Sequence, residues 1–336
     1  MSAISMRRLA FGLIDGALSP VARRWGGEPR LNILCYHGIW LGPGHFGSML
    51  FMRPGTFRAR LAHLRDRGYE VVSLTEGMAR WRAGTVGRKT CVLTIDDGWY
   101  GTYRHMLPAL KEFGYPATLY AYTRPILAGE PVYSVAARYL AGHLDATARD
   151  RFLATEGAEL AAALKAHGGD LVDALVARID ALPDRDARLA LLGRLAAAGG
   201  LDWADLVRNR VFDLMTPDEL ADWGRQGLDI QLHTHNHDSC VGDPARLARE
   251  LAENSAALAG IAPNPLVHFC YPSGEYSPDL YPVLAEAGIE SATTTDQGAN
   301  GTGANPLALR RLMDGEGISL SEFSAELSGA TGMFRR

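Results

Sequence analysis

Two adjacent carboxylates are the first side chains of this sequence that could do chemistry. Asp96 and Asp97 directly follow an apolar, β-branched run at 90–95, and Gly98 permits a sharp turn after them. Two carboxylates at the end of a buried strand are costly unless something compensates their charge, which a metal ion does. For these two residues alone, a cap on the following helix is the simpler interpretation.

Three imidazoles lie close together farther along the chain, in His233-Thr234-His235-Asn236-His237. Neutral imidazole is the commonest metal ligand in proteins, and three of them at a strand end are unusual for a core. If the strand continues, His233 and His235 share a face; if the chain turns after His233, then His233 and His237 can converge. The spacing does not choose between these pairs, but beside two aspartates the cluster favours a metal site.

A third loop with the composition of a site is Tyr271-Pro272-Ser273-Gly274. Pro and Gly favour a turn here, and the amides of a turn can point into a site. Each of the three loops follows a predicted strand, and in parallel α/β folds ligands gather at the carboxyl ends of the strands. We therefore expect the three loops to meet at one end of the fold.

Alternating strands and helices must position these loops. Short apolar runs predict strands, and apolar residues at helical spacing between them predict helices. A capping box at Thr216 and Glu219 begins one helix, and we expect Thr75 to cap another. Such alternation is typical of a parallel sheet or barrel with helices outside. The predicted strands are 31–36, 69–74, 90–95, 116–122, 228–235, 266–271 and 289–295.

Between the fourth and fifth of these strands the pattern changes. Residues 130–211 are rich in Ala, Leu, Arg and Asp, and they contain no strand-like run. Apolar residues step by four here, as in Leu171 and Leu175, which predicts helices. The sequence thus predicts a helical insertion at 130–211 between two parts of a main domain, 31–129 and 212–330.

Composition places the chain among globular proteins. Of its 336 residues, 47% are apolar and 21% are charged, and the net charge is −4. These values argue against a disordered chain and give no sign of a partner nucleic acid. No uncharged apolar run is long enough to span a membrane.

Residues 1–30 predict an amphipathic surface segment, with contact to a membrane surface as the weaker alternative, because basic residues flank an apolar stretch. The four cysteines, Cys35, Cys91, Cys240 and Cys270, form no CxxC pair. Free, buried thiols in a reducing compartment are the simplest interpretation. We therefore expect a cytoplasmic protein that can associate with a membrane through its amino-terminal segment.

Taken together, the motifs resemble those of polysaccharide deacetylases of the NodB-homology type, carbohydrate esterase family 4. The family's TFDDG motif appears as TIDDG at 94–98, its H-[ST]-x-x-H motif as HTHNH at 233–237, and its aromatic-Pro-aromatic-Gly turn as YPSG at 271–274. The resemblance covers roughly residues 31–126 and 212–313. It implies an α/β fold, a distorted (β/α)7 barrel, here with a helical insertion.

The resemblance also implies an activity, the metal-dependent hydrolysis of an N-acetyl amide on an amino sugar, with Zn²⁺ as the expected ion and an N-acetylated saccharide as substrate. It assigns Asp97, His233 and His237 to the metal, Asp96 to the catalytic base, and the backbone N–H of Ser273 to the oxyanion. Two His and one Asp leave open positions on a metal, as a catalytic site requires. Zinc lowers the pKa of bound water from about 15.7 toward ~7.

The sequence departs from the family pattern at three places, the first being Ser273, which stands where the turn motif has its second aromatic residue. The family's third motif often carries an arginine that orients the catalytic aspartate, and Cys270 stands near that place. The last motif often holds a histidine that acts as general acid, and none occurs at 310–314. His37 and His268 are the candidate general acids, with a structural histidine as the alternative for each.

Four residues are candidates for substrate binding: Tyr271, His37, Arg310 and Arg311. Either arginine could bind an anionic group of the substrate or hold Asp96, and a surface salt bridge is the simpler interpretation.

The leading function is therefore de-N-acetylation of amino sugars in a polysaccharide or glycan. The same site would serve a deformylase or deacetylase of a lipid-linked sugar, with the amino-terminal segment on the membrane. A degenerate, non-catalytic carbohydrate-binding barrel is the third alternative, which the missing arginine and histidine favour. The retained Asp96 argues against it, because a protein that only binds metal or sugar does not need this carboxylate.

Overall fold

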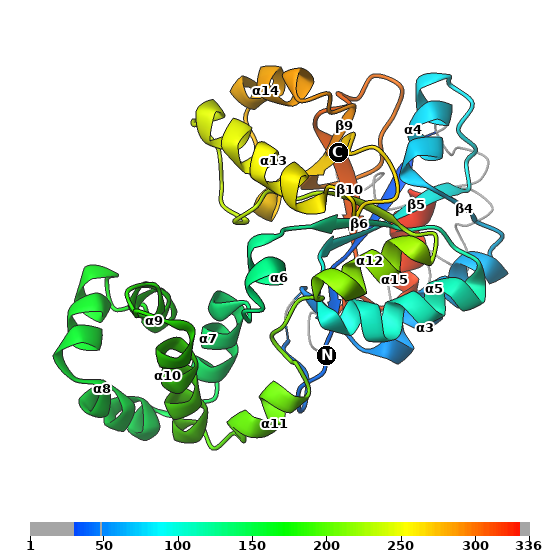
Figure 1. Ribbon diagram of the computed structural model, residues 1–336. Coiled ribbons are helices and arrows are strands. Elements are labelled where there is room, and N and C mark those ends of the chain that lie inside the picture. Colours follow the sequence, from blue (N-terminus) through cyan, green and yellow to red (C-terminus); the bar gives the residue numbers. More distant parts are fainter. Residues whose placement is uncertain (1–29, 48, 330–336) are drawn as a thin grey trace. The chain divides into compact units, whose positions relative to one another are not determined.

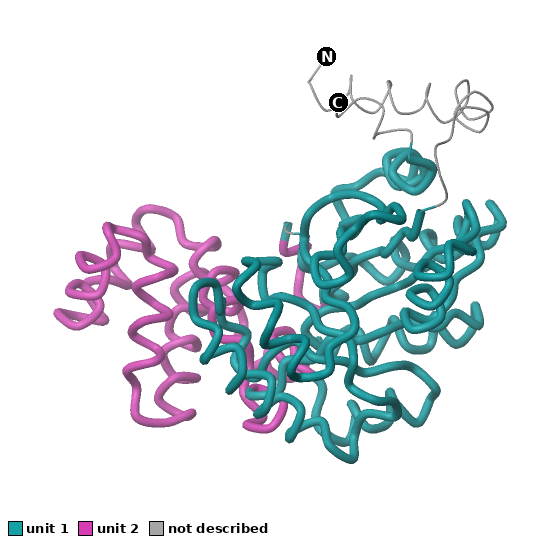
Figure 2. The backbone as a smooth tube through the Cα atoms, turned by 90° about the horizontal axis from the view of Figure 1, so that it is seen from above, with its two compact units in different colours: residues 1–40, 47–124, 215–336 teal, residues 41–46, 125–214 magenta. Residues whose placement is uncertain are grey.

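The computed structural model describes residues 30–47 and 49–329. The amphipathic segment predicted at 1–30 lies outside the described residues, apart from Arg30. The chain divides into two compact units, and the second interrupts the first (Figure 2). Of the described residues, one unit comprises 30–40, 47, 49–124 and 215–329, and the other comprises 41–46 and 125–214.

Seven parallel strands of the first unit close into a barrel, which confirms the predicted α/β barrel. Their order is β1-β10-β9-β8-β7-β6-β5, and β1 pairs with β5 along its whole length to close the ring. Strand β4 pairs with the first residues of β5, and β2 pairs with β3 in a separate small sheet. The strands are β1 (Asn32–Tyr36), β2 (Gly38–Ile39), β3 (Phe51–Met52), β4 (Glu70–Val72), β5 (Thr90–Asp97), β6 (Thr118–Ala121), β7 (Asp229–Leu232), β8 (His268–Cys270), β9 (Ser291–Gln297) and β10 (Leu309–Met313).

Residue type explains most of these strands. Every residue of β1 and β5 is buried, as expected for apolar strands of a parallel barrel that is covered on both faces. β10 is missing from the strands predicted by sequence, because Arg310 and Arg311 interrupt its apolar pattern. In the structure these neighbours point to opposite faces of β10: Arg310 is exposed and Arg311 is fully buried.

Helices cover the outside of the barrel (Figure 1). The capping box predicted at Thr216 and Glu219 is present. Thr75 is not a cap, however, because α4 begins earlier and the hydroxyl of Ser73 accepts a hydrogen bond from the amide of Glu76. In the described part of this unit the α-helices are α3 (Pro54–Asp66), α4 (Leu74–Arg82), α5 (Leu107–Phe113), α12 (Pro217–Arg225), α13 (Pro244–Leu258), α14 (Tyr281–Glu286) and α15 (Leu320–Ser328), and a π-helical turn (Thr102–Met106) leads into α5.

Residues 125–214 of the second unit are largely helical. Aspartate side chains accept hydrogen bonds from the first amides of four of these helices, which accounts for the aspartates among the alanines and leucines of this stretch. The helices are α6 (Arg124–Ala128), α7 (Tyr133–Ala141), α8 (Ala146–Ala166), α9 (Leu171–Asp180), α10 (Arg185–Ala198) and α11 (Trp203–Arg208).

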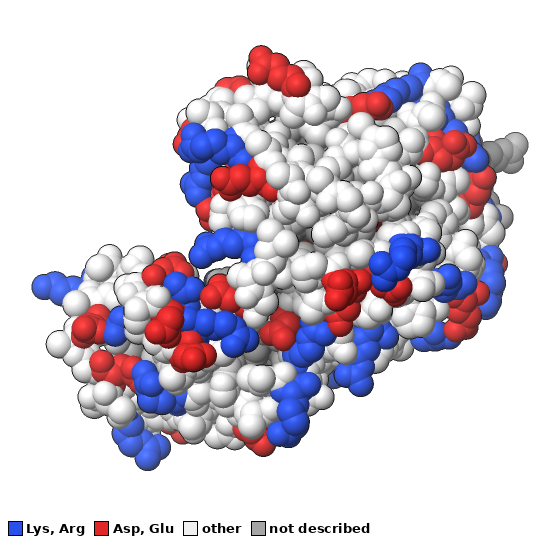
Figure 3. Space-filling view, viewed as in Figure 1, with Lys and Arg blue, Asp and Glu red and all other residues white. Residues whose placement is uncertain are grey.

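The surface carries charges of both signs. On the face shown in Figure 3, Lys and Arg residues are interspersed with Asp and Glu residues, and neither sign gathers into one continuous patch. Among the residues described, no helix combines the length and the apolar character needed to cross a lipid bilayer.

Candidate metal centre and active site

The three loops singled out by sequence meet at the carboxyl ends of the barrel strands, as expected. Asp96 and Asp97 are the last residues of β5, His233 directly follows β7, and Tyr271 directly follows β8. The ring of His233 bridges the other two loops. Its Nε2 lies 3.4 Å from Oδ1 of Asp97, and its Nδ1 lies 2.8 Å from the carbonyl oxygen of Cys270.

Asp97, His233 and His237 form a compact set of ligand atoms. Oδ1 of Asp97 lies 3.4 Å from Nε2 of His233 and 3.5 Å from Nε2 of His237, and one ligand atom from each residue lies within 4.8 Å of the others. Ligands about 2.0–2.2 Å from a tetrahedral zinc ion stand roughly 3.4 Å apart. The identity of these residues and their spacing therefore fit a divalent metal ion.

The histidine loop resolves the alternative that the spacing left open. Strand β7 ends at Leu232, and Thr234 has a φ of 63°, so the chain turns here. This turn brings His237, and not His235, beside His233. The ring of His235 lies elsewhere, with Nδ1 2.8 Å from the hydroxyl of Thr123.

Backbone strain marks the same three loops. Of the non-glycine residues that the structure describes, five have φ in the left-handed region, and four of these belong to the loops: Asp97 (75°), Thr234 (63°), His237 (62°) and Ser273 (56°). Such a conformation costs on the order of 1–2 kcal/mol per residue and persists only where the surroundings hold it. This concentration of strain is a sign of a functional site that is independent of the side chains.

Burial and neighbouring charges set the protonation of the cluster. Desolvation and the nearby His233 lower the pKa of His237 to about 4, so this half-buried ring is neutral at neutral pH. Burial opposes ionisation of Asp97, but the hydrogen bond with His233 and the charges of both histidines hold its pKa well below the usual range. Burial also opposes protonation of His233, but Cys270 and Asp97 outweigh it and raise the pKa of this imidazole. A bound cation would replace the proton that His233 otherwise shares with Asp97.

Hydrogen bonds from outside the cluster orient its ligands. The indole N–H of Trp99 donates to Oδ2 of Asp97 at 2.7 Å, which leaves Oδ1 for the histidines. The carbonyl of Cys270 accepts from Nδ1 of His233, which directs Nε2 toward Asp97. The sequence did not single out Trp99, since an aromatic residue after a turn more often packs in a hydrophobic core than binds a ligand of a metal.

Helix α13 holds the histidine loop through two side chains one turn apart. The carboxylate of Glu250 accepts hydrogen bonds from the amides of His235 and Asn236, both at 2.8 Å. The amide oxygen of Asn254 accepts from the amide of His233 at 2.9 Å. Both side chains are buried, and they satisfy amides that lose their strand partners where the chain turns. The sequence signal for Glu250 and Asn254 is that these polar residues are four apart on the buried face of a predicted helix. That signal does not indicate which loop they bind.

Replacing Glu250 with glutamine is expected to weaken zinc binding about 10- to 100-fold. The three ligands stay in place, but a glutamine side chain offers one oxygen where the carboxylate offers two, so the loop is held less firmly. Competition with a chromophoric chelator measures the affinity. Glu253→Gln, at an exposed position of the same helix, is the control and should bind as the unmodified protein does. Equal affinities for both variants would show that Glu250 does not position the loop.

Asp96 is held by Arg311. Nη1 and Nη2 of the guanidinium donate to Oδ1 and Oδ2 of the carboxylate, each at 2.7 Å, and Nε donates to the carbonyl of Thr294 at 2.8 Å. The Arg311 side chain is 0% exposed. The surface salt bridge expected for this residue is therefore wrong, and the buried, fully engaged guanidinium does not have the position of a substrate-binding residue. Arg310 lies on the opposite face of β10, outside this cluster.

The environment of Asp96 keeps it ionised. Burial opposes ionisation, but the charge of Arg311 and its two hydrogen bonds outweigh burial and lower the pKa of Asp96 to about 2. The thiols of Cys35 and Cys270 each lie 3.6 Å from Oδ2. All four cysteines are free and buried, as predicted.

The two candidate general acids have different surroundings. His268 is buried, and its ring nitrogens lie 3.0 Å from the hydroxyl of Thr75 and 2.8 Å from that of Ser291. Burial lowers the pKa of His268 to about 4, so it is a structural histidine. His37 has Nε2 3.8 Å from Oδ2 of Asp96 and a ring that is 12% exposed. It is the candidate that stands beside the site.

The residues of the turn at 271–274 differ in burial and in hydrogen bonding. Tyr271 is buried, and its hydroxyl donates to the carbonyl of Leu307 at 2.9 Å, so this hydroxyl is already engaged. Ser273 is exposed, and the hydrogen bonds within the turn come from the amides of Gly274 and Glu275. The amide of Ser273 is not one of the donors that close the turn.

Comparison with known proteins now identifies the chain. A family model for polysaccharide deacetylases matches residues 83–146 and 187–292, about half of the sequence. The chain belongs to the polysaccharide deacetylase family. All three loops of the site lie within the matched residues.

Individual relatives of this family member are distant. YxkH of Bacillus subtilis (strain 168), whose name places it among polysaccharide deacetylases, is 20% identical over 298 residues, 88% of this chain and 75% of that protein. The poly-beta-1,6-N-acetyl-D-glucosamine N-deacetylase of Escherichia coli (strain K12) is 36% identical over 67 residues, 20% of this chain and 10% of that protein. The structure of the Streptococcus pyogenes deacetylase PplD in complex with acetate has a TM-score of 0.59 at 16% identity, covering 90% of this chain and 99% of that chain. The last comparison shows a shared fold.

This member of the family obtains its aspartate-binding arginine from an unexpected strand. Cys270 on β8 stands where the resemblance places an arginine, and Arg311 on β10 reaches Asp96 instead. Its Nη2 also lies 3.3 Å from Sγ of Cys270. The smaller side chain at 270 thus leaves room for a guanidinium that enters from two strands away in the ring.

Proposed function

We propose that this polysaccharide deacetylase is a metal-dependent hydrolase that removes N-acetyl groups from the amino sugars of a polysaccharide or glycan, with Zn²⁺ as its ion. The observation that carries the proposal is the Asp96 carboxyl group, held by two hydrogen bonds from Arg311 directly beside the Asp97, His233 and His237 cluster. A structural metal site has four protein ligands and no use for such a carboxylate. Three ligands with a neighbouring base are what hydrolysis requires.

The residues of the chain divide the work of amide hydrolysis. Asp97, His233 and His237 would hold the zinc ion, which when bound polarises the acyl carbonyl and lowers the pKa of a water molecule. Asp96 retains acceptor capacity on both oxygens after its bonds to Arg311, and it accepts the proton that the attacking water loses. Arg311 fixes the direction in which Asp96 points.

Two further groups complete the proposed mechanism. The amide of Ser273 donates a hydrogen bond to the oxygen that gains negative charge as water adds to the acyl carbon. His37 protonates the amine that leaves, because it is the candidate general acid that stands beside Asp96. The exposed edge of its ring gives it access to a substrate.

Two relatives support the substrate class. The Escherichia coli protein is named as a deacetylase of poly-beta-1,6-N-acetyl-D-glucosamine, and the Streptococcus pyogenes deacetylase was solved with acetate, the acid that de-N-acetylation releases. We extend this class of substrate to the present chain. Oligomers of N-acetylglucosamine are therefore the first substrates to test.

The test is acetate release by the zinc-reconstituted protein from a panel of N-acylated saccharides that includes N-formyl sugars. Asp96→Asn is expected to retain zinc and to lower kcat roughly 10²- to 10⁴-fold, because it removes the base and leaves the metal ligands. Thermal unfolding of the variant, recorded alongside, separates lost chemistry from lost fold. A carbohydrate-binding protein without catalysis would instead release no acetate from any saccharide, and Asp96→Asn would leave its binding unchanged.

A further inference from the structure

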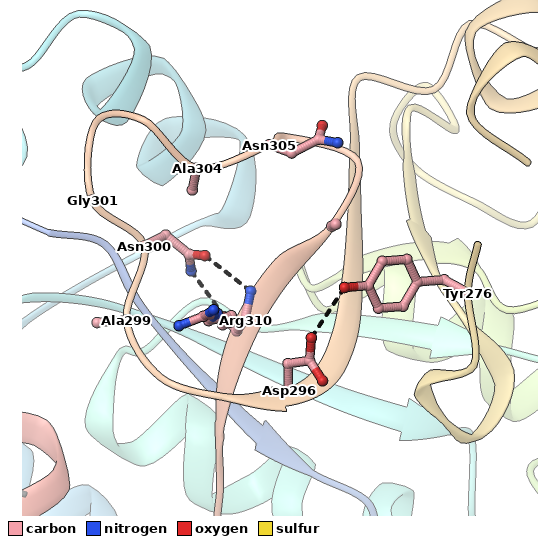
Figure 4. Close-up of a pocket in the computed structure, with 9 residues that line it drawn as sticks. Tyr276, Asp296, Ala299, Asn300, Gly301, Ala304, Asn305 and Arg310 are labelled. Carbon is pink, nitrogen blue, oxygen red and sulfur yellow. Dashed lines mark hydrogen bonds between the residues drawn. The ribbon is translucent and has the colours of Figure 1, made fainter. Parts of the chain in front are cut away.

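A polar pocket lies on the outside of the barrel, under the connection between β9 and β10 (Figure 4). Parallel strands are usually joined through a helix, but residues 298–308 contain none. Residues of this connection, of β9 and of β10 line a cavity of about 330 Å³, near the lower end of the range for ligand pockets. Its wall includes Tyr276, Asp296, Asn300, Asn305 and Arg310.

Asn300 fixes the shape of this pocket. Its backbone pairs with Leu31 in both directions, at 2.9 and 3.0 Å. Its side-chain oxygen accepts from the amide of Arg310 at 2.9 Å, and its side-chain nitrogen donates to the carbonyl of Arg310 at 2.8 Å, as Figure 4 shows. The connection is therefore tied both to β10 and to the residue before β1, which fixes the wall of the pocket.

Two side chains of opposite charge line the pocket without forming an ion pair. Oδ2 of Asp296 accepts from the hydroxyl of Tyr276 at 3.1 Å, and its other oxygen retains full acceptor capacity. Within residues 30–47 and 49–329, the Arg310 guanidinium has no hydrogen bond or ion pair. A donor and an acceptor, both exposed, thus line the same cavity.

The pocket adjoins the catalytic turn. The hydroxyl of Thr295 donates to the carbonyl of Ser273 at 3.3 Å, and Asp296 is the next residue of β9. On the other side of the turn, the ring of Tyr276 packs against that of Tyr271, with centroids 5.5 Å apart. A molecule in the pocket would therefore lie close to the turn that carries the proposed oxyanion donor.

We propose that this pocket binds a neutral sugar unit of the saccharide chain, near the unit that is deacetylated; the inference rests on the proposed function. Arg310 donates and Asp296 accepts, which suits neighbouring hydroxyl groups of a pyranose, and the half-buried ring of Tyr276 offers an apolar surface to its C–H groups. The opposite charges of the two side chains disfavour a unit with net charge of either sign. The cavity volume suits one small unit, so the pocket is a subsite and not a groove for a long polymer.

The subsite predicts a dependence on substrate length. For β-1,6-linked N-acetylglucosamine oligomers from dimer to pentamer, we expect kcat/KM to rise once the oligomer reaches the pocket. Arg310→Ala and Asp296→Asn are expected to lower kcat/KM for the pentamer about tenfold and to leave the value for the dimer unchanged. Arg225→Ala is the control, because this exposed arginine ends α12 and does not line the pocket.

Binding of the pentamer to zinc-depleted protein, followed by calorimetry, separates this inference from the proposed function. If the zinc-loaded protein hydrolyses no oligomer but Arg310→Ala weakens pentamer binding, the pocket binds sugar and the hydrolase proposal fails. If Arg310→Ala and Asp296→Asn hydrolyse and bind the pentamer as well as Arg225→Ala does, or if no pentamer binding is measured, the subsite is refuted.

Discussion

Replacing Asp97 with asparagine is expected to abolish tight zinc binding and to lower kcat/KM at least about 10⁴-fold. Asp97 supplies the ligand atom that lies within 3.5 Å of both histidines, and a neutral amide oxygen is a far poorer partner for zinc. The ion contributes several kcal/mol of transition-state stabilisation, and each 1.36 kcal/mol is a factor of ten in rate. Metal content by mass spectrometry and acetate release measure the two effects.

The backbone at this position separates the roles of charge and conformation. Asp97 has a φ of 75°, which asparagine tolerates and alanine does not, at a cost of about 1–2 kcal/mol. Asp97→Ala should therefore lose zinc as Asp97→Asn does and also unfold at a lower temperature. Added zinc should raise the unfolding temperature of the unmodified protein and of neither variant, because only the former binds the ion in its folded state.

Asp238→Asn is the control for this pair of variants. Asp238 directly follows the histidine motif and forms an ion pair with Arg246. It is therefore an aspartate of the same loop that does not belong to the metal cluster. It should retain zinc and activity. If Asp97→Asn binds zinc as tightly as Asp238→Asn does, the ion is not held by the cluster of Asp97, His233 and His237.

The fold was largely predictable because most barrel strands are continuous apolar runs. A buried parallel strand needs apolar side chains on both faces, and the sequence of β5 meets this condition up to its two aspartates. Strand β10 does not, since Arg311 is buried only because Asp96, far away in the sequence, neutralises it. A local sequence pattern therefore does not predict that Arg311 is buried, because its partner Asp96 lies on another strand.

The candidate site was also predictable in part. The aspartate pair and the histidine cluster at strand ends indicate a metal site when taken together. The choice of His237 over His235 came from the family resemblance, and in the structure it follows from the turn at Thr234. Glu250, Asn254 and Trp99 act through single hydrogen bonds to backbone or carboxylate atoms of the loops. These hydrogen bonds depend on where a helix or an indole packs in three dimensions. The spacing of residues along the sequence does not predict such packing.

Replacing Arg311 with methionine is expected to lower the free energy of unfolding by about 3–5 kcal/mol, because it leaves Asp96 as a buried carboxylate without its partner. Arg310→Met is a matched control on the same strand: its side chain is exposed on the opposite face, and the change should stay within about 0.5 kcal/mol. Arg311→Lys keeps the charge but not the paired hydrogen bonds, so its loss should be intermediate. Denaturant unfolding of the three variants measures these differences.

The pH dependence tests whether Arg311 acts through Asp96. In the unmodified protein the pKa of Asp96 is about 2, below the value of about 3.9 in an unfolded chain. Its stabilising contribution is therefore present above about pH 3.9 and is lost as the pH falls through 2. In Arg311→Met, burial is opposed only by the charges of His37 and His233, so the pKa of Asp96 rises. The loss of stability should therefore be largest at neutral pH and should shrink as the carboxyl takes up a proton. The acid limb of kcat/KM should move to higher pH, and adding Asp96→Asn to Arg311→Met should restore part of the stability.

A loss of stability that is the same at every pH, or that adds to the loss caused by Asp96→Asn, would mean that Arg311 supports the barrel core and does not act through Asp96.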